Sequence, residues 1–305
     1  MRHADIKLGL AVSGGPDSTA MLLLAASTLP GRVEAATVDH GLRAEAAAEA
    51  AAVAQLCRRL AVPHQILKVK LDGGNIQAEA RAARYAALQG WLERQQLAAL
   101  ATAHHADDQA ETLLLRLNRA SGVAGLAGVR SRGQVPGGAS PLLRPLLGWR
   151  RAELAAIVAR AGLVPAQDRS NDDDRFDRVR IRKAMAGADW LDIPALAASA
   201  AHLGDAEAAM DWAARREWSE TVSREGLGIV YRPQAPKTIA LRVIARIVAE
   251  LGEDDARGGA IARLFAALVA GQPASIGALV VRPSRAGWSF MRSPQRAVRK
   301  QPKNG

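Results

Sequence analysis

Two short segments of the chain group hydroxyl, carboxylate and imidazole side chains in patterns that could bind a phosphate. The first, SGGPDS, follows an apolar run, precedes a helical pattern, and consists of Ser13, Gly14, Gly15, Pro16, Asp17 and Ser18. Its glycines let the backbone approach a ligand closely, and its proline fits the first turn of a helix. Free N–H groups at that helix end attract an anion, and Asp17 could hold a magnesium ion on the phosphates. The simpler alternative is an ordinary strand–helix turn in which Asp17 only favours the helix end.

This turn differs from two common nucleotide-binding loops. A Walker-type loop carries a lysine beside its final serine or threonine, whereas the residues in that position here are Asp17, Ser18 and Thr19. A dinucleotide-binding loop needs glycines at GxGxxG spacing, which Gly14 and Gly15 do not provide. We therefore expect a phosphate site that belongs to neither class.

The second segment, HHADDQAET, places His104 and His105 before three acidic residues. On a helix that begins near Ala106, Glu111 lies four residues after Asp107 and three after Asp108, so the carboxylates share one neighbourhood. A neutral histidine could accept a proton from a nucleophile or stabilise a leaving group. The spacing that zinc sites use is missing. In the simpler alternative, the acidic residues only complement the dipole of the first helical turn.

A third polar cluster, in VDHGLR, ends another predicted strand. Asp39 and His40 could meet a nucleotide there, and Arg43 could meet a phosphate. Alternatively, Asp39 caps the helix that follows.

Several basic residues lie on predicted helices. Arg81, Arg84 and Tyr85 share one helix face, while Arg116 and Arg119 end a second helix. Arginine beside an aromatic ring can bind phosphate or stack on a base. Alternatively, these side chains form an ordinary solvent-exposed helix face with no binding role.

The elements that must position these clusters alternate between short strands and helices. We expect strands at 6–12, 33–38, 64–69 and 97–103, and helices at 17–28, 45–61, 76–95 and 106–119. This alternation predicts an α/β fold, with a doubly wound parallel sheet that binds ligands beyond the carboxyl ends of its strands. The three clusters follow the first, second and fourth strands. We therefore expect them to form one site.

After residue 120 the composition and the predicted secondary structure of the chain change. Residues 121–145 are rich in Gly, Ser and Pro and predict a loop, with RGQVPGGAS as its mobile part, before a helix at 149–161. We expect a catalytic domain at 1–190 and a smaller, mostly helical domain at 191–291. Within the latter, helices at about 194–224, 236–251 and 258–270 precede a hairpin of strands 277–282 and 287–291. The basic tail, 292–305, is expected to be disordered.

Composition narrows the class of protein. The 305 residues favour about two domains, and 41 Lys+Arg against 30 Asp+Glu give a net charge of +11. This charge favours a polyanionic partner such as nucleic acid, although an arginine-rich proteome would have the same effect. A single cysteine, Cys57, excludes internal disulfides and cysteine-based metal clusters and suits a cytosolic enzyme. We find no run of about 20 apolar residues for a membrane span, and no signal-peptide pattern.

SGGPDS resembles the pyrophosphate-binding loop of the N-type ATP pyrophosphatases, the PP-loop superfamily with the adenine nucleotide alpha hydrolase-like fold. Their enzymes cleave ATP between its α and β phosphates. Together with VDHGLR, EARAARY, HHADDQAET, LNRASGVAGLAG, RPLL and DRSNDDDRFDRVRIR, it makes residues 7–183 similar to the tRNA(Ile)-lysidine synthase family. Two departures, Ala120 for a glycine and Val179 for an asparagine, lie away from the expected chemistry.

The resemblance implies a reaction in which ATP, with Mg²⁺, adenylates the wobble cytidine of a tRNA(Ile) with a CAU anticodon, and free lysine then displaces AMP. ATP binding is implied for Ser13, Gly14, Gly15, Pro16, Asp17, Ser18, Asp39, His40 and Arg43, with Asp17 also holding Mg²⁺ through the phosphates. Catalysis is implied for Asp17, His104, His105, Asp107 and Asp108. Lysine binding is expected from Asp108 and Glu111. The resemblance also implies that the domain at 191–291 contacts tRNA, together with Arg81, Arg84, Tyr85, Arg116, Arg119, Arg180 and Arg182.

Three other functions fit these residues less well. A tRNA thiolase of the same superfamily usually needs more cysteines than Cys57. A glutamine-dependent amidotransferase needs a glutaminase domain, for which no segment remains. A non-catalytic tRNA-binding protein would not need intact Asp17, Asp39 and His104.

Overall fold

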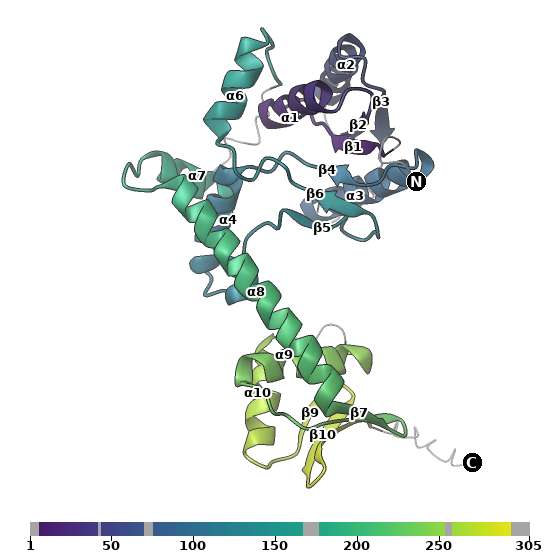
Figure 1. Cartoon of the computed structure of the whole chain (residues 1–305), viewed down its shortest axis with the longest axis vertical. Coiled ribbons are helices and arrows are strands. Elements are labelled where there is room, and N and C mark those ends of the chain that lie inside the picture. The colour runs from purple at the N-terminus through teal and green to yellow at the C-terminus, as the bar shows by residue number, and fades with distance from the viewer. Residues whose placement is uncertain (1–5, 42–43, 70–75, 167–176, 254–257, 294–305) are drawn as a thin grey trace, which may run out of the picture. The chain divides into compact units, whose positions relative to one another are not determined.

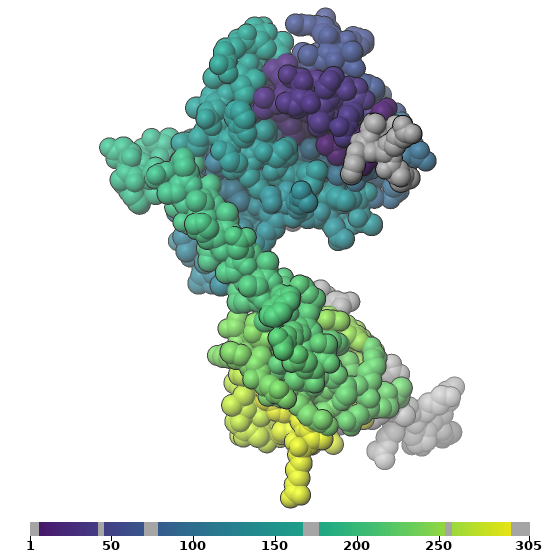
Figure 2. Space-filling view, viewed as in Figure 1, coloured from purple at the N-terminus to yellow at the C-terminus, as the bar shows by residue number. Residues whose placement is uncertain are grey.

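The computed structural model describes residues 6–41, 44–69, 76–166, 177–253 and 258–293 (Figure 1). The chain forms two compact units, Met1–Gly204 and Asp205–Gly305, which are described separately (Figure 2). The division falls inside helix α8, Ile193–Thr221, and not near residue 190 as predicted. The reason is that α8 is continuous, while its first turns pack through Ile193 and Leu196 against Ala106 and Ala110 of the first unit.

The first unit contains a six-stranded sheet with the strand order β3-β2-β1-β4-β6-β5. Its strands are β1 (Leu8–Ala11), β2 (Val33–Asp39), β3 (His64–Lys68), β4 (Leu100–Ala101), β5 (Arg132–Gln134) and β6 (Pro141–Leu143). All neighbouring pairs are parallel except β5 with β6. The predicted parallel α/β sheet is therefore confirmed, with one antiparallel edge strand. Since β2 and β4 lie on opposite sides of β1, the strand order reverses between β1 and β4, where such sheets bind ligands.

Helices cover both faces of this sheet (Figure 1). On one face, Leu10 and Val12 pack with residues of α1 (Pro16–Thr28), α2 (Ala44–Arg59) and α6 (Arg151–Arg160). On the other face, α3 (Ile76–Arg94) buries Trp91 and Leu92 against Leu100 and Leu142. Alternate residues of β4 thus belong to different cores, as a strand covered on both sides requires.

The segment predicted as a loop at 121–145 contains regular structure. It forms helix α5 (Val123–Leu126) and the hairpin of β5 and β6, in which the Val135 N–H donates to the Ser140 carbonyl at 2.9 Å. Gly137 adopts a φ of 73°, which suits glycine. RGQVPGGAS is therefore a hairpin and not an irregular mobile loop; its turn residues dominate the composition and conceal two three-residue strands.

The second unit combines helices with a five-stranded antiparallel sheet of order β7-β8-β11-β10-β9. The predicted helices are confirmed as the end of α8, α9 (Lys237–Glu250) and α10 (Gly258–Val269), and the predicted hairpin as β10 (Leu279–Ser284) and β11 (Gly287–Arg292). The strands β7 (Val222–Glu225), β8 (Gly228–Tyr231) and β9 (Ala274–Ile276) were not predicted. This unit is therefore less purely helical than expected.

Within the ranges given above, no helix is long and apolar enough to cross a membrane. Arg43, the acidic stretch from 167 to 176 and the tail from 294 onwards lie outside the described residues.

Candidate functional site

The three polar clusters lie at the same edge of the parallel sheet. SGGPDS follows β1, and HHADDQAET follows β4, which pairs directly with β1. Asp39 ends β2, on the other side of β1. The carboxyl ends of parallel strands meet at one edge, so the expected convergence of the three clusters is confirmed.

Backbone conformation and internal hydrogen bonds define the shape of the SGGPDS loop. Gly14 has a φ of 91°, which disfavours any residue with a side chain. The Ser18 hydroxyl donates to the Gly15 carbonyl at 3.1 Å and accepts the Ser13 N–H at 3.2 Å. Gly15 caps α1 without a side-chain hydrogen bond, and Pro16 opens the helix. No side chain therefore caps the first N–H groups of α1, and they are available to an anion.

His105 lies at the centre of an acidic cluster. It caps α4 (Ala106–Leu117): its Nδ1 accepts the Asp108 N–H at 3.4 Å, and its own N–H donates to Asp108 Oδ2 at 3.1 Å. Its Nε2 lies 3.5 Å from both Asp17 Oδ2 and Asp108 Oδ2. Both distances are longer than a usual hydrogen bond, and the contacts become ion pairs only when the imidazole is protonated. Burial favours the neutral imidazole, but Asp17 and Asp108 outweigh it and raise the pKa of His105.

Two polar atoms in this cluster are buried without a hydrogen-bond partner among the described residues, Asp17 Oδ1 and His105 Nε2. Magnesium fits the first of these, because Mg²⁺ takes oxygen ligands, commonly one or two carboxylates together with substrate phosphates. The described residues contain no group of three or more His, Cys, Asp or Glu suited to a metal ion. A metal ion at Asp17 would need further ligands from outside these side chains.

His104 differs from its neighbour in charge. Its Nδ1 lies 3.0 Å from the Thr102 hydroxyl. Burial, more than any other effect, lowers the pKa of His104 to about 4, and although Asp108 acts in the opposite sense, nearby arginines reinforce the shift. His104 is consequently neutral at pH 7, and its unprotonated ring can take part in hydrogen bonds.

Asp107, predicted as catalytic, is engaged in joining two helices. Both of its carboxylate oxygens accept hydrogen bonds at 3.2 Å from the Arg150 guanidinium, and Oδ2 accepts the Arg151 N–H at 2.8 Å. Burial alone would raise the pKa of Asp107, but these hydrogen bonds lower it. The bidentate pair fixes the start of α6 against α4, so the geometry favours a positioning role over a catalytic one.

Glu111, predicted to bind the lysine ammonium, is paired with arginine instead. Its side chain is 2% exposed, and Arg182 Nε donates to Oε1 at 2.7 Å while Arg151 Nη2 lies 3.7 Å away. Arg182 comes from α7 (Asp177–Ala186), which packs against α4. Glu111 and Arg182 thus pair with each other in this structure, and the lysine contact of Glu111 and the tRNA contact of Arg182 remain predictions.

The other residues predicted to contact tRNA differ in exposure and in whether an acidic residue already pairs with them. Tyr85 is 4% exposed and belongs to the core, so it cannot stack on a base; the Arg81 guanidinium lies 5.1 Å from its ring centre. Arg84 and Arg116 are exposed. Arg119 and Arg180 are exposed too, but both pair with Asp177.

At the end of β2, Asp39 Oδ1 accepts the Gly41 N–H at 2.9 Å. This contact closes a turn. Burial and then the charge of Arg84 lower the pKa of His40, against the effect of Asp39. His40 Nδ1 is buried, with no hydrogen-bond partner in the described ranges. A polar group of a ligand would satisfy it.

Sequence reasoning missed several residues of this region. Thr102, Arg150 and Arg151 carry no motif of their own, and Arg178 stands in a run of arginines. Arg144 begins RPLL, a stretch with no pattern that would place it in a site. Thr102 contacts His104, only two residues away. Arg150 and Arg151 both contact Asp107, which is distant in the chain, and no spacing rule reveals such a contact.

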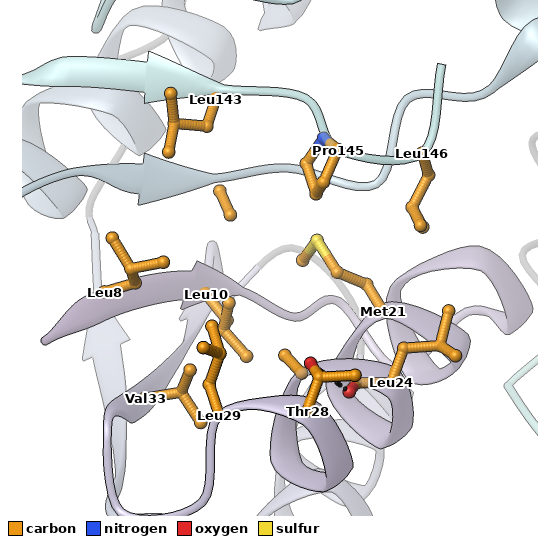
Figure 3. A pocket seen from close by; sticks show the side chains of 12 residues that line it. Leu8, Leu10, Met21, Leu24, Thr28, Leu29, Val33, Leu143, Pro145 and Leu146 are labelled. Atoms are coloured by element: carbon orange, nitrogen blue, oxygen red, sulfur yellow. Dashed lines mark hydrogen bonds between the residues drawn. The ribbon is translucent and has the colours of Figure 1, made fainter. Parts of the chain in front are cut away.

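An apolar cavity of about 170 Å³ lies elsewhere in the first unit (Figure 3). It is bounded by side chains of β1, α1 and β6, including Leu10, Met21 and Leu143. No charged side chain lines it. It therefore does not suit a polyphosphate and is separate from the site above.

Comparison with known proteins identifies relatives of the whole chain. Residues 2–188 match a family model described as the PP-loop domain. A tRNA(Ile)-lysidine synthase from Novosphingobium aromaticivorans is 48% identical over 96% of this chain and 91% of its own. One from Zymomonas mobilis is 41% identical, over 95% and 89%. A solved U34-tRNA thiolase from Methanococcus maripaludis has 17% identity and a TM-score of 0.52, covering 65% of this chain and 71% of its own. That likeness concerns the fold alone.

Proposed function

This chain belongs to the tRNA(Ile)-lysidine synthase family of PP-loop proteins, and we propose that it joins free lysine to C2 of the wobble cytidine in the CAU anticodon of tRNA(Ile) at the expense of ATP. The cytidine C2 oxygen attacks the α phosphate of ATP, and the bond to pyrophosphate breaks. The lysine ε-amine then forms a bond to C2, loses a proton, and AMP leaves with the oxygen.

One observation carries the proposal: the SGGPDS loop and the acidic cluster around His105 lie next to each other where the strand order of the sheet reverses. The SGGPDS loop after β1 offers helix N–H groups to the ATP phosphates, and the acidic cluster around His105 adjoins it after β4. Asp17 would hold Mg²⁺, which supplies charge neutralisation for the pyrophosphate leaving group. Adenylation turns a poor leaving oxygen into a good one.

Within this site we assign roles by charge. Neutral His104 meets the phosphates or assists transfer through hydrogen bonds of its unprotonated ring. Asp108 holds the lysine ammonium, because its carboxylate lies near His105 and has no arginine hydrogen bond among the described residues. Glu111 is less suited to that role, since Arg182 engages its carboxylate.

The partners follow from the reaction. They are tRNA(Ile), free lysine and ATP with Mg²⁺, and all are available in the cytoplasm, where we expect the protein to act. Exposed arginines such as Arg84 and Arg116, and the second unit, are our candidates for further tRNA contacts.

Sulfur transfer, the alternative within the superfamily, is disfavoured by Cys57. Its thiol is fully buried, and burial raises its pKa to about 11. A sulfur carrier needs an accessible thiolate.

The first half-reaction gives a test. Pyrophosphate release should require ATP and the CAU transcript but not lysine, and it should disappear when the wobble cytidine is replaced by uridine. Asp17→Asn should lower its rate at least a hundredfold while tRNA binding persists, because Asp17 acts on metal and phosphates. Equal release with the uridine transcript would contradict the assignment.

A further inference from the structure

Thr37 of β2 and His64 of β3 form a hydrogen-bonded pair that reaches the last residue before the SGGPDS loop. The Thr37 hydroxyl donates to the Val12 carbonyl at 2.8 Å, and it lies 2.9 Å from His64 Nε2. We propose that this pair, the Thr37–His64 relay, positions the loop for ATP by orienting the peptide bond at which β1 passes into it. The inference rests on the proposed function, in which that loop holds the ATP phosphates.

The two side chains can meet because they lie on the same face of the sheet. Their strands pair in parallel, and His64 lies opposite Ala35, two residues before Thr37. Side chains alternate along a strand, so those of Ala35 and Thr37 point to one face. Ala35 belongs to the core that α1 and α2 cover. Thr37 itself is only 4% exposed, so its hydroxyl is shielded from water.

The direction of both hydrogen bonds follows from the chemistry of the groups. A carbonyl oxygen can only accept, so the single hydroxyl hydrogen of Thr37 is committed to Val12. The contact with His64 therefore needs a hydrogen from the ring, on Nε2. Burial lowers the pKa of His64, so the ring is neutral at pH 7 and carries one N–H. The relay thus specifies the Nε2–H tautomer of His64.

The peptide bond between Val12 and Ser13 is held on both sides. Thr37 binds its carbonyl, while its N–H, which belongs to Ser13, donates to the Ser18 hydroxyl at 3.2 Å. The contact with Ser18 lies within the loop, whereas the contact with Thr37 ties the loop to the neighbouring strand. Rotation of this peptide bond would break both contacts. The orientation of the first loop peptide therefore depends on Thr37.

Other carbonyls of the loop are engaged in a similar way. The Gly14 carbonyl accepts the Ala166 N–H at 3.1 Å, and the Gly15 carbonyl accepts the Thr19 N–H at 3.0 Å. Backbone N–H groups attract a phosphate, whereas the partial negative charge of a carbonyl oxygen repels it. An oxygen bound by a donor of the protein is not free to turn towards the phosphates. The relay has the same effect at the entrance of the loop, from outside the SGGPDS motif.

The dissociation constant of ATP with Mg²⁺, measured by calorimetry, tests the relay. Thr37→Val keeps the shape of the side chain but removes the hydroxyl, and should weaken ATP binding about tenfold. Thr37→Ser restores the hydroxyl and should remain within about twofold of the wild type. The matched control is Thr28→Val, because Thr28 donates to the Leu24 carbonyl at 2.8 Å at the other end of α1. This control should leave ATP binding unchanged.

Because His64 acts through Thr37, a double-mutant cycle distinguishes the relay from two independent effects. His64→Phe should weaken ATP binding about threefold in the wild type, but not further in Thr37→Val. His64→Gln, whose carboxamide can replace the Nε2 donor, should recover most of this loss. In the wild type, NMR of the histidine ring nitrogens should show the Nε2–H tautomer for His64.

Three results would overturn the relay. They are a Thr37→Val variant that binds ATP as Thr28→Val does, even if it is less stable in urea; losses from Thr37→Val and His64→Phe that simply add; and an Nδ1–H tautomer of His64. The tautomer needs no variant, so it decides the matter if Thr37→Val unfolds. Failure of the proposed function is a different result, namely a wild-type protein that binds ATP but forms no lysidine. In that case the same ATP affinities still decide whether the relay positions the loop.

Discussion

Glu111 lies between two arginines from different helices, Arg182 of α7 and Arg151 of α6. Glu111→Gln would leave both guanidinium groups without their carboxylate. Breaking a buried ion pair costs about 3–5 kcal/mol, but Arg182 and Arg151 are 29% and 34% exposed, so water screens part of this loss. We expect a decrease of about 1–3 kcal/mol in the free energy of unfolding, measured with urea.

The control is Arg182→Gln, alone and combined with Glu111→Gln. A coupling energy of about 1 kcal/mol or more in this double-mutant cycle would support the pairing. If Glu111→Gln instead leaves stability unchanged and raises only the KM for lysine, the carboxylate faces the substrate, and our structural assignment is wrong.

At this residue scale, the sequence identified the segments that meet but not the pairing of their charges. Asp17, His104 and Asp108 could be found because their motifs lie at strand ends. The Glu111–Arg182 contact spans 71 positions in the chain, and Tyr85 is buried by tertiary packing. Spacing along one helix carries no information about either. The predicted roles of the individual site residues remain predictions.

At the scale of elements, a single side chain joins α4 to the loop between α5 and β5. The Gln109 carboxamide donates to the Val129 carbonyl and accepts the Val129 N–H. Gln109→Glu would turn the donating group into a second acceptor, so that a carboxylate oxygen faces a carbonyl at a buried position. We expect a loss of about 2–4 kcal/mol in unfolding free energy.

Gln55→Glu is the matched control, because it makes the same change in charge at a position of α2 that is exposed. It should change stability by no more than about 0.5 kcal/mol. Comparable urea midpoints for the two variants would show that the carboxamide clamp is unimportant.

The sequence predicted the elements that contain a clear apolar run or helical segment. Helices α1 to α4 and strands β1 to β4 were found in this way. Strands β5, β7 and β9 are short and contain no apolar run. Their pairing depends on partners elsewhere in the chain, which also explains why the second unit was expected to be mostly helical.

At the scale of the whole molecule, the two compact units share the continuous helix α8. No change in composition marks the division at Gly204, which is why the sequence located it earlier. The net charge of +11 suits a tRNA substrate. The expected tRNA contact of the second unit remains a prediction.

The central claim, that lysine is ligated to a wobble cytidine, can be measured directly. Wild-type protein is incubated with ATP, Mg²⁺, labelled lysine and a tRNA(Ile) transcript with a CAU anticodon, and the digested nucleosides are then separated. We predict label in a single modified cytidine with the mass of lysidine, formed only with ATP and absent when the wobble base is uridine. Label that never enters the tRNA, or that appears equally in the uridine transcript, would contradict the account.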